Sequence, residues 1–267
     1  MSALALTLAD SRTMLRRNLR RLERYPSMTL LLIGMPIVFL LLFVYVFGGQ
    51  LGAGLGAEFA GGHVGRQAYV NYVVPGILLM TLAAAVQGTA IVVAMDMTGG
   101  ITDRFRTMSI ARAAVLGGHV MASMIQALVG LAIVLVLAVA IGFRPTADPL
   151  SWLGAIGVLA LFGLGLIWLA TALGLAAKSV ETASNTPMFL TLLPFLGSGF
   201  VPTATMPAGL RQFAEYQPFT PVTETVRGLL TGTHIGAEAI GAVAWSLAII
   251  VASYLWAIHL YTHREPR

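Results

Sequence analysis

The sequence predicts an all-α membrane protein with six membrane-spanning helices, an amphipathic helix before them and re-entrant helices between spans 5 and 6. Of the 267 residues, 57% are hydrophobic and only 10% are charged, whereas charged residues make up about a quarter of a typical soluble domain. The apolar residues are also gathered into blocks near the length of about 20 residues that a helix needs to cross a bilayer. Six spans and their loops leave no room for a large soluble domain.

An amphipathic helix is predicted in residues 1–27, before the first apolar block. Leucines recur at helical spacing on one face, and arginines follow helical spacing on the others. The leucines are Leu8, Leu15, Leu19 and Leu22, and the arginines are Arg12, Arg16, Arg17, Arg20, Arg21 and Arg24. This pattern is typical of a helix that lies along the inner leaflet, with its arginines at anionic lipid headgroups. Two roles are open for such a helix. In the first it only anchors the topology of the chain, and in the second it gates lateral lipid entry or braces a partner subunit.

Residues 28–267 form the predicted membrane domain. Its first apolar block contains Pro36, which membrane helices tolerate, and is too long to be the core of a cleaved signal peptide. Residues 48–68 are rich in glycine and predict a loop. Span 5 is expected to begin at Pro187, because proline suits the first position of a helix. The six predicted spans are residues 28–47, 69–95, 113–142, 152–177, 187–201 and 240–261.

Residues 202–236 are too polar and too rich in proline to cross lipid. Two short helices are predicted within them, at residues 208–216 and 222–230. These helices can dip into the outer leaflet if neighbouring helices cover their backbone ends. The candidates for an outer gate in this segment are Pro218, Pro221, Glu224 and Arg227, with the last two as a charge pair.

The distribution of Lys and Arg predicts that both termini lie in the cytoplasm. Alternate segments carry twelve basic residues on one side and four on the other. The richer side holds the N-terminal segment, residues 97–112, Lys178 and the tail, and the other side holds Arg66, Arg144, Arg211 and Arg227. Basic segments stay in the cytoplasm, and an even number of spans agrees with this orientation.

Motifs for catalysis or for an internal energy source are missing from the sequence. The absence of cysteine excludes thiolate metal sites and thiol catalysis. The single lysine, Lys178, follows Ala177, so the glycine-lysine pair of a phosphate-binding loop is missing. The spans carry essentially no ionisable group of the kind that ion-driven pumps need, apart from His259 near the tail. We therefore expect no catalytic residue, no metal site, no cofactor on this chain and no nucleic-acid partner.

Two sets of polar residues are candidates for function. Residues 97–112 mix glycine, arginine and apolar residues, which suits a short helix that docks in a groove on another protein, or else they form only a solvated basic loop. The second set is neutral and lies inside the spans, where its members bond neighbouring helices together or line a substrate route. This set consists of Gln87, Gln126, Thr191 and Ser198.

Three segments resemble the membrane subunits of ABC-2 type exporters, particularly the daunorubicin-resistance-like permeases. In residues 96–112 an acidic residue, a glycine and an Arg-Phe pair stand where that family has them before its short coupling helix. The other two segments are residues 200–207, FVPTATMP, and residues 217–227, QPFTPVTETVR. The resemblance covers nearly the whole chain, and the chain departs from some relatives at Ser109, where a proline often occurs.

This resemblance implies a permease subunit of a drug-resistance-like exporter in a bacterial plasma membrane. Two such subunits, identical or different, would pair with two copies of a separate ATPase subunit, which binds ATP and Mg²⁺. The coupling segment that receives the ATPase stroke would consist of Asp96, Gly100, Asp103, Arg104, Phe105, Arg106 and Arg112. The expected cargo is amphiphilic, drug-like or lipid-like. Two alternatives remain open, an ion-coupled secondary transporter and a non-transporting membrane scaffold.

Overall fold

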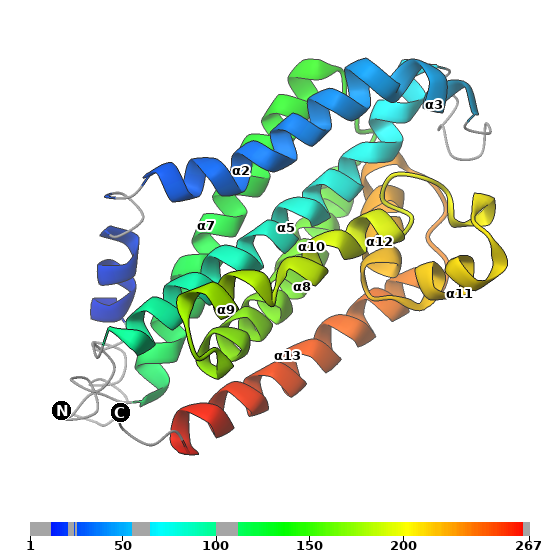
Figure 1. Cartoon of the computed structure of the whole chain (residues 1–267). Helices are drawn as coiled ribbons and strands as arrows, with labels where there is room; N and C mark the ends of the chain where they lie inside the picture. Colours follow the sequence, from blue (N-terminus) through cyan, green and yellow to red (C-terminus); the bar gives the residue numbers. More distant parts are fainter. Residues whose placement is uncertain (1–11, 21–23, 25, 55–64, 100–111, 264–267) are drawn as a thin grey trace.

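The computed structural model describes residues 12–20, 24, 26–54, 65–99 and 112–263 (Figure 1). Every regular element among these residues is a helix and none is a strand, which confirms the all-α prediction. Five of the described helices are long and apolar enough to cross a membrane. They are Leu32–Ala53, Arg66–Thr98, Leu116–Ile141, Pro149–Ala176 and Glu238–His263.

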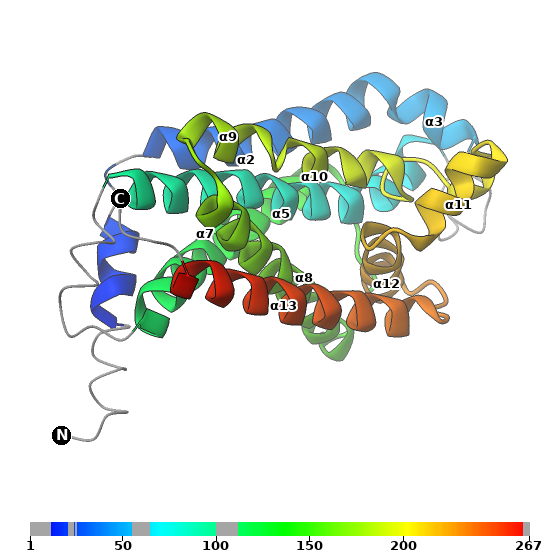
Figure 2. The same cartoon turned by 60° about the horizontal axis from the view of Figure 1, so that its bottom comes forward.

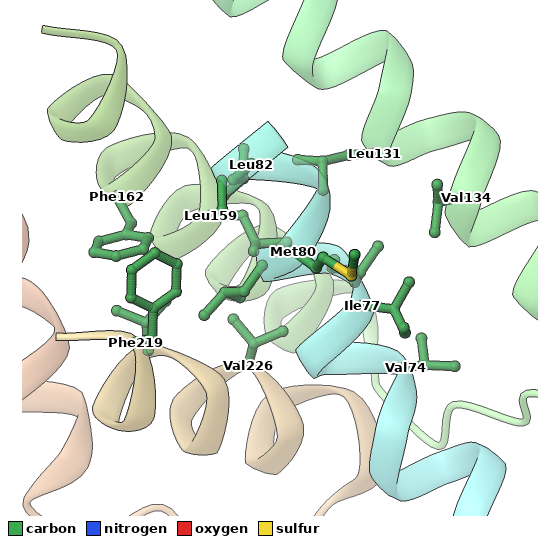
Figure 3. Close-up of a cluster of buried hydrophobic side chains, with 14 of the residues drawn as sticks. Val74, Ile77, Met80, Leu82, Leu131, Val134, Leu159, Phe162, Phe219 and Val226 are labelled. Atoms are coloured by element: carbon green, nitrogen blue, oxygen red, sulfur yellow. The ribbon is translucent and has the colours of Figure 1, made fainter. Parts of the chain in front are cut away.

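The central helix of the bundle is α5, Arg66–Thr98, which is 33 residues long and has buried side chains on all its sides. A helix that is apolar all round is expected to be enclosed by other helices. Those packed against it include α2, Pro26–Leu41, α7, Arg112–Ile141, and α8, Pro149–Ala176. Figure 3 shows the resulting core, in which Ile77 and Leu82 of α5 lie among side chains from α7, α8 and a later helix.

Helix α8 joins α5 to the last helix, α13, Glu238–His263. A Cβ atom added at Gly174 of α8 would lie 2.7 Å from the backbone oxygen of Ala90 in α5, so a glycine is needed at this crossing. On its other side, the ring of Trp168 meets the ring of Tyr254 in α13 edge to face, with centroids 5.0 Å apart. Small residues set the closest approach, as is common between membrane helices.

The first span is longer than predicted and consists of three helical stretches. They are α2, the π-helix Leu42–Phe47 and α3, Gly48–Gly54. The first part of the predicted loop 48–68 is therefore helical. Glycine usually signals a loop, but Gly48 and Gly52 here let α3 pack closely on the start of α5.

The predicted fifth span, residues 187–201, is not one continuous helix, and this prediction is wrong. The chain instead forms α9, Val180–Asn185, α10, Met188–Leu192, and the 3-10 helix Leu193–Leu196, and then leaves helical structure between Gly197 and Pro202. Pro194 lacks a backbone donor, and two glycines follow within five residues, which together favour a break in the helix here. None of these short helices is among the five long ones.

Two helices follow the break. α11, Ala208–Tyr216, has the predicted bounds, and α12, Phe219–Thr231, begins before the predicted residue 222. α12 is largely buried and contacts α5, α8 and α13, whereas α11 is exposed except at Ala214 (Figure 2). α12 therefore belongs to the core of the bundle, and α11 lies on its surface.

The shorter helices outside the long spans lie at two opposite ends of the bundle. The helix of residues 12–20 lies where α5 ends and α7 begins, and it crosses that end instead of running along the bundle (Figure 1). At the opposite end, α11 and α12 lie near the connection between α7 and α8, where Thr146 donates to the backbone oxygen of Leu230 at 3.0 Å. Each end carries one buried cluster of charged side chains.

Candidate functional site

The first cluster surrounds Asp96, close to the end of α5. Its side chain is buried, with only 3% of the residue exposed. Arg17 of the helix 12–20 forms an ion pair with Asp96, and Nε2 of His119 in α7 lies 3.3 Å from its Oδ2 atom. One carboxylate thus connects three separate elements at a single point.

The contact between the helix 12–20 and α7 depends on one glycine. A Cβ atom added at Gly118 would lie 2.6 Å from the Cβ atom of Met14, so the two helices meet nearly backbone to backbone. Met14 and Asn18 are buried, and Arg17 lies on the same face of the helix, one turn from Met14. The predicted amphipathic helix is therefore attached to the bundle through a face that combines a methionine with polar residues.

His119 was not among the residues that we singled out from the sequence. It lies in α7 with 4% of its surface exposed, which corrects the expectation that the long helices hold essentially no ionisable group. The signal was present, because an ionisable residue inside an apolar block marks a candidate functional site. Only the fold places its ring beside Asp96. The Asp96 carboxylate is buried but the Arg17 side chain is 32% exposed, so we expect the ion pair to contribute about 2–3 kcal/mol to the attachment.

Most of the predicted coupling residues lie outside the described residues. These are Gly100, Asp103, Arg104, Phe105 and Arg106. Arg112 is the first residue of α7, but its side chain also lies outside the described part. Asp96 alone can be placed, at the point where the chain leaves α5 toward these residues.

The second cluster is built around Arg227 of α12, at the opposite end of the bundle. Arg227 is 3% exposed and donates to the backbone oxygens of Ser198, at 2.7 Å, and Tyr72, at 3.2 Å. Its guanidinium carbon lies 3.8 Å from the centroid of the Tyr72 ring, within the range of a cation-π contact. Oε1 of Glu224, one turn earlier in α12, lies 2.6 Å from Nη1 of Arg227. The expected charge pair is therefore present.

These side chains satisfy the backbone of the broken segment 197–202. The hydroxyl of Tyr72 donates to the oxygen of Ser198 at 2.9 Å, and that of Tyr69 donates to the oxygen of Phe200 at 3.2 Å. The backbone N–H of Ser198 donates to the hydroxyl of Thr220 at 3.3 Å. Non-helical backbone is tolerated at membrane depth only where protein groups replace the missing bonds. Sequence reasoning missed Tyr69 and Tyr72, since nothing in their spacing indicates distant backbone partners.

The other predicted gate residues also lie on or beside α12. Pro218 directly precedes the helix, and Pro221 is buried in its first turn. A Cβ atom added at Gly241 of α13 would lie 3.3 Å from the Cβ atom of Pro221, so the proline faces that helix. Three of the four predicted gate residues thus lie on α12, with Pro218 just before it, and Glu224 and Arg227 form an ion pair.

Of the predicted route residues, the two glutamines join neighbouring helices, whereas Thr191 and Ser198 do not. Gln87 donates to the backbone oxygen of Ser184 at 3.2 Å, which joins α5 to α9. Gln126 donates to the hydroxyl of Thr29 at 2.9 Å, which joins α7 to α2. Thr191 bonds within its own helix, and the hydroxyl of Ser198 is buried without a hydrogen-bond partner among the described residues. The structure does not gather these residues on one surface.

Comparison with known proteins gives a consistent result along most of the chain. The model of the ABC-2 type transporter family matches residues 10–231. The daunorubicin resistance ABC transporter permease protein DrrB1 of Streptomyces coeruleorubidus is 28% identical over 253 residues, which cover 94% of this chain and 85% of that protein. The probable doxorubicin resistance ABC transporter permease protein DrrC of Mycobacterium tuberculosis is 25% identical over 177 residues, which cover 65% of this chain and 64% of that protein.

Proposed function

This chain belongs to the ABC-2 type transporter family, and we propose that it is the permease subunit of an ATP-driven exporter that moves amphiphilic, drug-like or lipid-like molecules out of the cytoplasm. It is an integral membrane protein whose relatives are ABC transporter permeases. A separate ATPase subunit, present in two copies and holding ATP and Mg²⁺, supplies the energy. A second permease subunit completes the transport path.

The observation that carries this proposal is the attachment at Asp96. The helix 12–20, the end of α5 and the start of α7 meet at this one buried carboxylate. Residues 97–112, the proposed docking segment, follow Asp96 directly in the sequence and lead to α7. A push on that segment by a partner therefore acts on three elements together.

The proposed topology places both termini in the cytoplasm of a bacterial cell, with the protein in the plasma membrane. The arginine-rich N-terminal segment and the docking segment then share the cytoplasmic side, as the distribution of basic residues favours. The segment α9 to Pro202 acts as the fifth of six membrane crossings, although it is broken. Tyr69, Tyr72 and Arg227 supply the donors that make such a broken crossing possible. α11 and α12 would close the outer side.

The proposed cargo follows from the surfaces of the spans. Large apolar side chains are exposed along α2, α7, α10 and α13. The two described buried charge clusters are paired internally and lie at opposite ends of the bundle. The drug-resistance permeases that this chain resembles also support an amphiphilic cargo over a hydrophilic ion or sugar. An ATPase rate of the purified complex that rises with a hydrophilic sugar and ignores amphiphiles would contradict this assignment.

Charge reversal in the docking segment tests the coupling role. The double variant Arg104→Glu/Arg106→Glu is expected to lose association with the ATPase, measured by co-purification, and to lose export. Arg211→Glu is the matched control, because Arg211 is exposed in α11 and its ion pair with Glu215 is of the weak surface kind. If the double variant keeps ATPase association, the docking assignment is wrong. If it loses association but still exports, the ATPase does not drive this permease.

A vesicle assay separates the exporter from an ion-coupled carrier. Proteoliposomes that contain only this permease, with an imposed proton or sodium gradient, are expected to show no uphill transport. Addition of the ATPase subunit and ATP is expected to start it. Uphill transport driven by the gradient alone would refute the proposal, and a scaffold would bind partners without moving cargo in either condition.

A further inference from the structure

The first span contains a stretch that is not α-helical. Residues Leu42–Phe47 form a π-helix between α2 and α3. A π-helix has hydrogen bonds from residue i to residue i+5, so it accommodates one extra residue in a turn, and such insertions are frequent at functional sites. The π-helix lies beside the broken segment, because the ring centroids of Phe43 and Phe200 are 4.7 Å apart. In the helical turns next to them, the ring centroids of Phe39 and Phe195 are 5.2 Å apart.

The extra residue keeps four buried positions on one face of the span. Leu40, Val44, Gly48 and Gly52 are all buried and are spaced four residues apart. We call these four positions the buried stripe. In a regular α-helix each residue turns by about 100°, so three steps of four residues would rotate the last position of the stripe about 120° away from the first. One inserted residue reduces that rotation by about 100°. The stripe therefore faces α5 along its whole length only while the π-helix is present.

The end of this stripe is packed closely against the start of α5, and only glycine fits at residue 52. A Cβ atom added at Gly48 would lie 3.0 Å from Cγ of Arg66, and one added at Gly52 would lie 2.0 Å from the backbone oxygen of Gly65. The guanidinium carbon of Arg66 also lies 5.5 Å from the ring centroid of Tyr45, inside the π-helix. We call this contact between α3 and the start of α5 the glycine contact.

The same sequence contains a second stripe that a regular α-helix would present. Leu40, Val44, Phe47 and Leu51 are spaced by four, three and four residues, the spacing of one apolar face of an α-helix. Phe47 is 42% exposed in the structure. Without the π-helix, Phe47 and Leu51 would turn toward α5 in place of the two glycines. Their bulk cannot fit against the start of α5, so α3 would have to move away.

We propose that the π-helix is a register switch for the outer end of the first span. In the π register, the glycine contact holds α3 against α5. Conversion to α-helix rotates α3 by about 100° and breaks the glycine contact. Packed interfaces change between discrete arrangements, and two stripes in one helix provide two of them. This inference rests on the proposed function, because the switch would open the outer side during the transport cycle.

Two single-residue deletions test the register on the permease alone. Deletion of Val46, which is 65% exposed in the π-helix, removes the extra residue and leaves Gly48 and Gly52 facing α5 in a regular α-helix. Its thermal unfolding midpoint is expected to stay within about 3 °C of the unmodified chain. Deletion of Val38, which is 56% exposed in regular α2, is the matched control and should lower the midpoint by about 10 °C or more, because it rotates the buried stripe. Equal effects of the two deletions would overturn the register assignment.

Cross-linking in the complete complex tests the switch. The sequence has no cysteine, so the double variant Gly48→Cys/Arg66→Cys offers one pair, placed close enough for a disulfide while the glycine contact exists. The rate of disulfide formation is expected to fall at least fivefold when a non-hydrolysable ATP analogue is bound. The cross-linked complex should hydrolyse ATP at least tenfold more slowly, and a reductant should restore the rate. The two single variants are the controls.

The outcomes separate the switch from the proposed function. If the cross-linked complex hydrolyses ATP at the unlinked rate, or the nucleotide leaves the cross-linking rate unchanged, the switch is refuted and the permease role stands. If the unmodified chain does not assemble with an ATPase, the proposed function fails, while the two deletions still decide the register.

Discussion

Replacement of Asp96 should release the helix 12–20 from the bundle. Asp96→Ala removes the ion pair with Arg17 and the contact with His119, both at one carboxylate. A hydrogen bond to a charged group contributes about 1.5–3 kcal/mol, and the Arg17 side chain is 32% exposed, so solvent compensates part of its loss. We expect the attachment to weaken by about 2–3 kcal/mol. At 1.4 kcal/mol for each factor of ten, the detached state becomes roughly 30 to 140 times more populated.

Labelling of an introduced thiol measures this detachment. Met14 is 7% exposed against α7, so a thiol from Met14→Cys is expected to react slowly with a maleimide while the helix 12–20 is attached. In the background of Asp96→Ala its labelling rate should rise by the same roughly 30- to 140-fold factor. Arg20→Cys is the matched control, because Arg20 is exposed on the same helix and should label quickly with or without Asp96. The chain has no other thiol.

The reasoning would be refuted by a protein that stays folded but labels at the original rate. In that case, packing of Met14 on Gly118 would hold the helix without the carboxylate. Asp96→Glu provides a second measurement, since it keeps the charge but lengthens the side chain in a buried site. It should label at an intermediate rate if ion-pair geometry matters.

Three further predictions concern stability. Arg227→Met removes a buried charged donor from the backbone oxygens of Ser198 and Tyr72 and should lower the free energy of unfolding by about 2–4 kcal/mol, measured by denaturant titration. An unchanged value would show that the guanidinium does not stabilise the broken segment. Gly174→Ala should cost about 1–3 kcal/mol because its Cβ atom would lie 2.7 Å from a backbone oxygen, whereas Gly157→Ala, which meets nothing within 4 Å, should be neutral. Hydrogen bonds from Ser151 hold the pKa of Asp148 below its ordinary value, so this cap stabilises α8 above about pH 4 and loses its effect as the pH falls through the lowered pKa. Asp148→Ala should therefore lower the unfolding midpoint at pH 7, with a difference that shrinks toward pH 3.

Sequence reasoning located most of the long helices because their apolar blocks far exceed the length of a soluble helix. The long helices lie over the predicted spans, and α11 has its predicted bounds. The errors occurred where glycine and proline have more than one structural meaning. Glycines after residue 47 continue a helix and pack against α5, whereas Pro194 and the glycines after it end one. Local propensity does not distinguish these cases, because the neighbouring helix decides between them.

In the candidate site, too, some residues could be predicted from the sequence and others only from the tertiary structure. Asp96, Glu224 and Arg227 were found from the sequence, because charged residues at the edges of apolar blocks are few. Their partners Arg17, His119 and Tyr72 come from segments up to 155 residues away, and no spacing rule connects them. Spacing reveals pairs on one helix, such as the Glu224 and Arg227 pair, but it carries no information about contacts between helices.

Composition and the length of the apolar blocks alone determined that this chain is a helical membrane protein, because the thickness of the bilayer sets how many apolar residues a spanning helix must have. The tertiary structure alone decided which charges are buried together, where the fifth crossing breaks and which face of the first span meets α5. These features depend on the distance between two backbones, and that distance is set only when the helices pack.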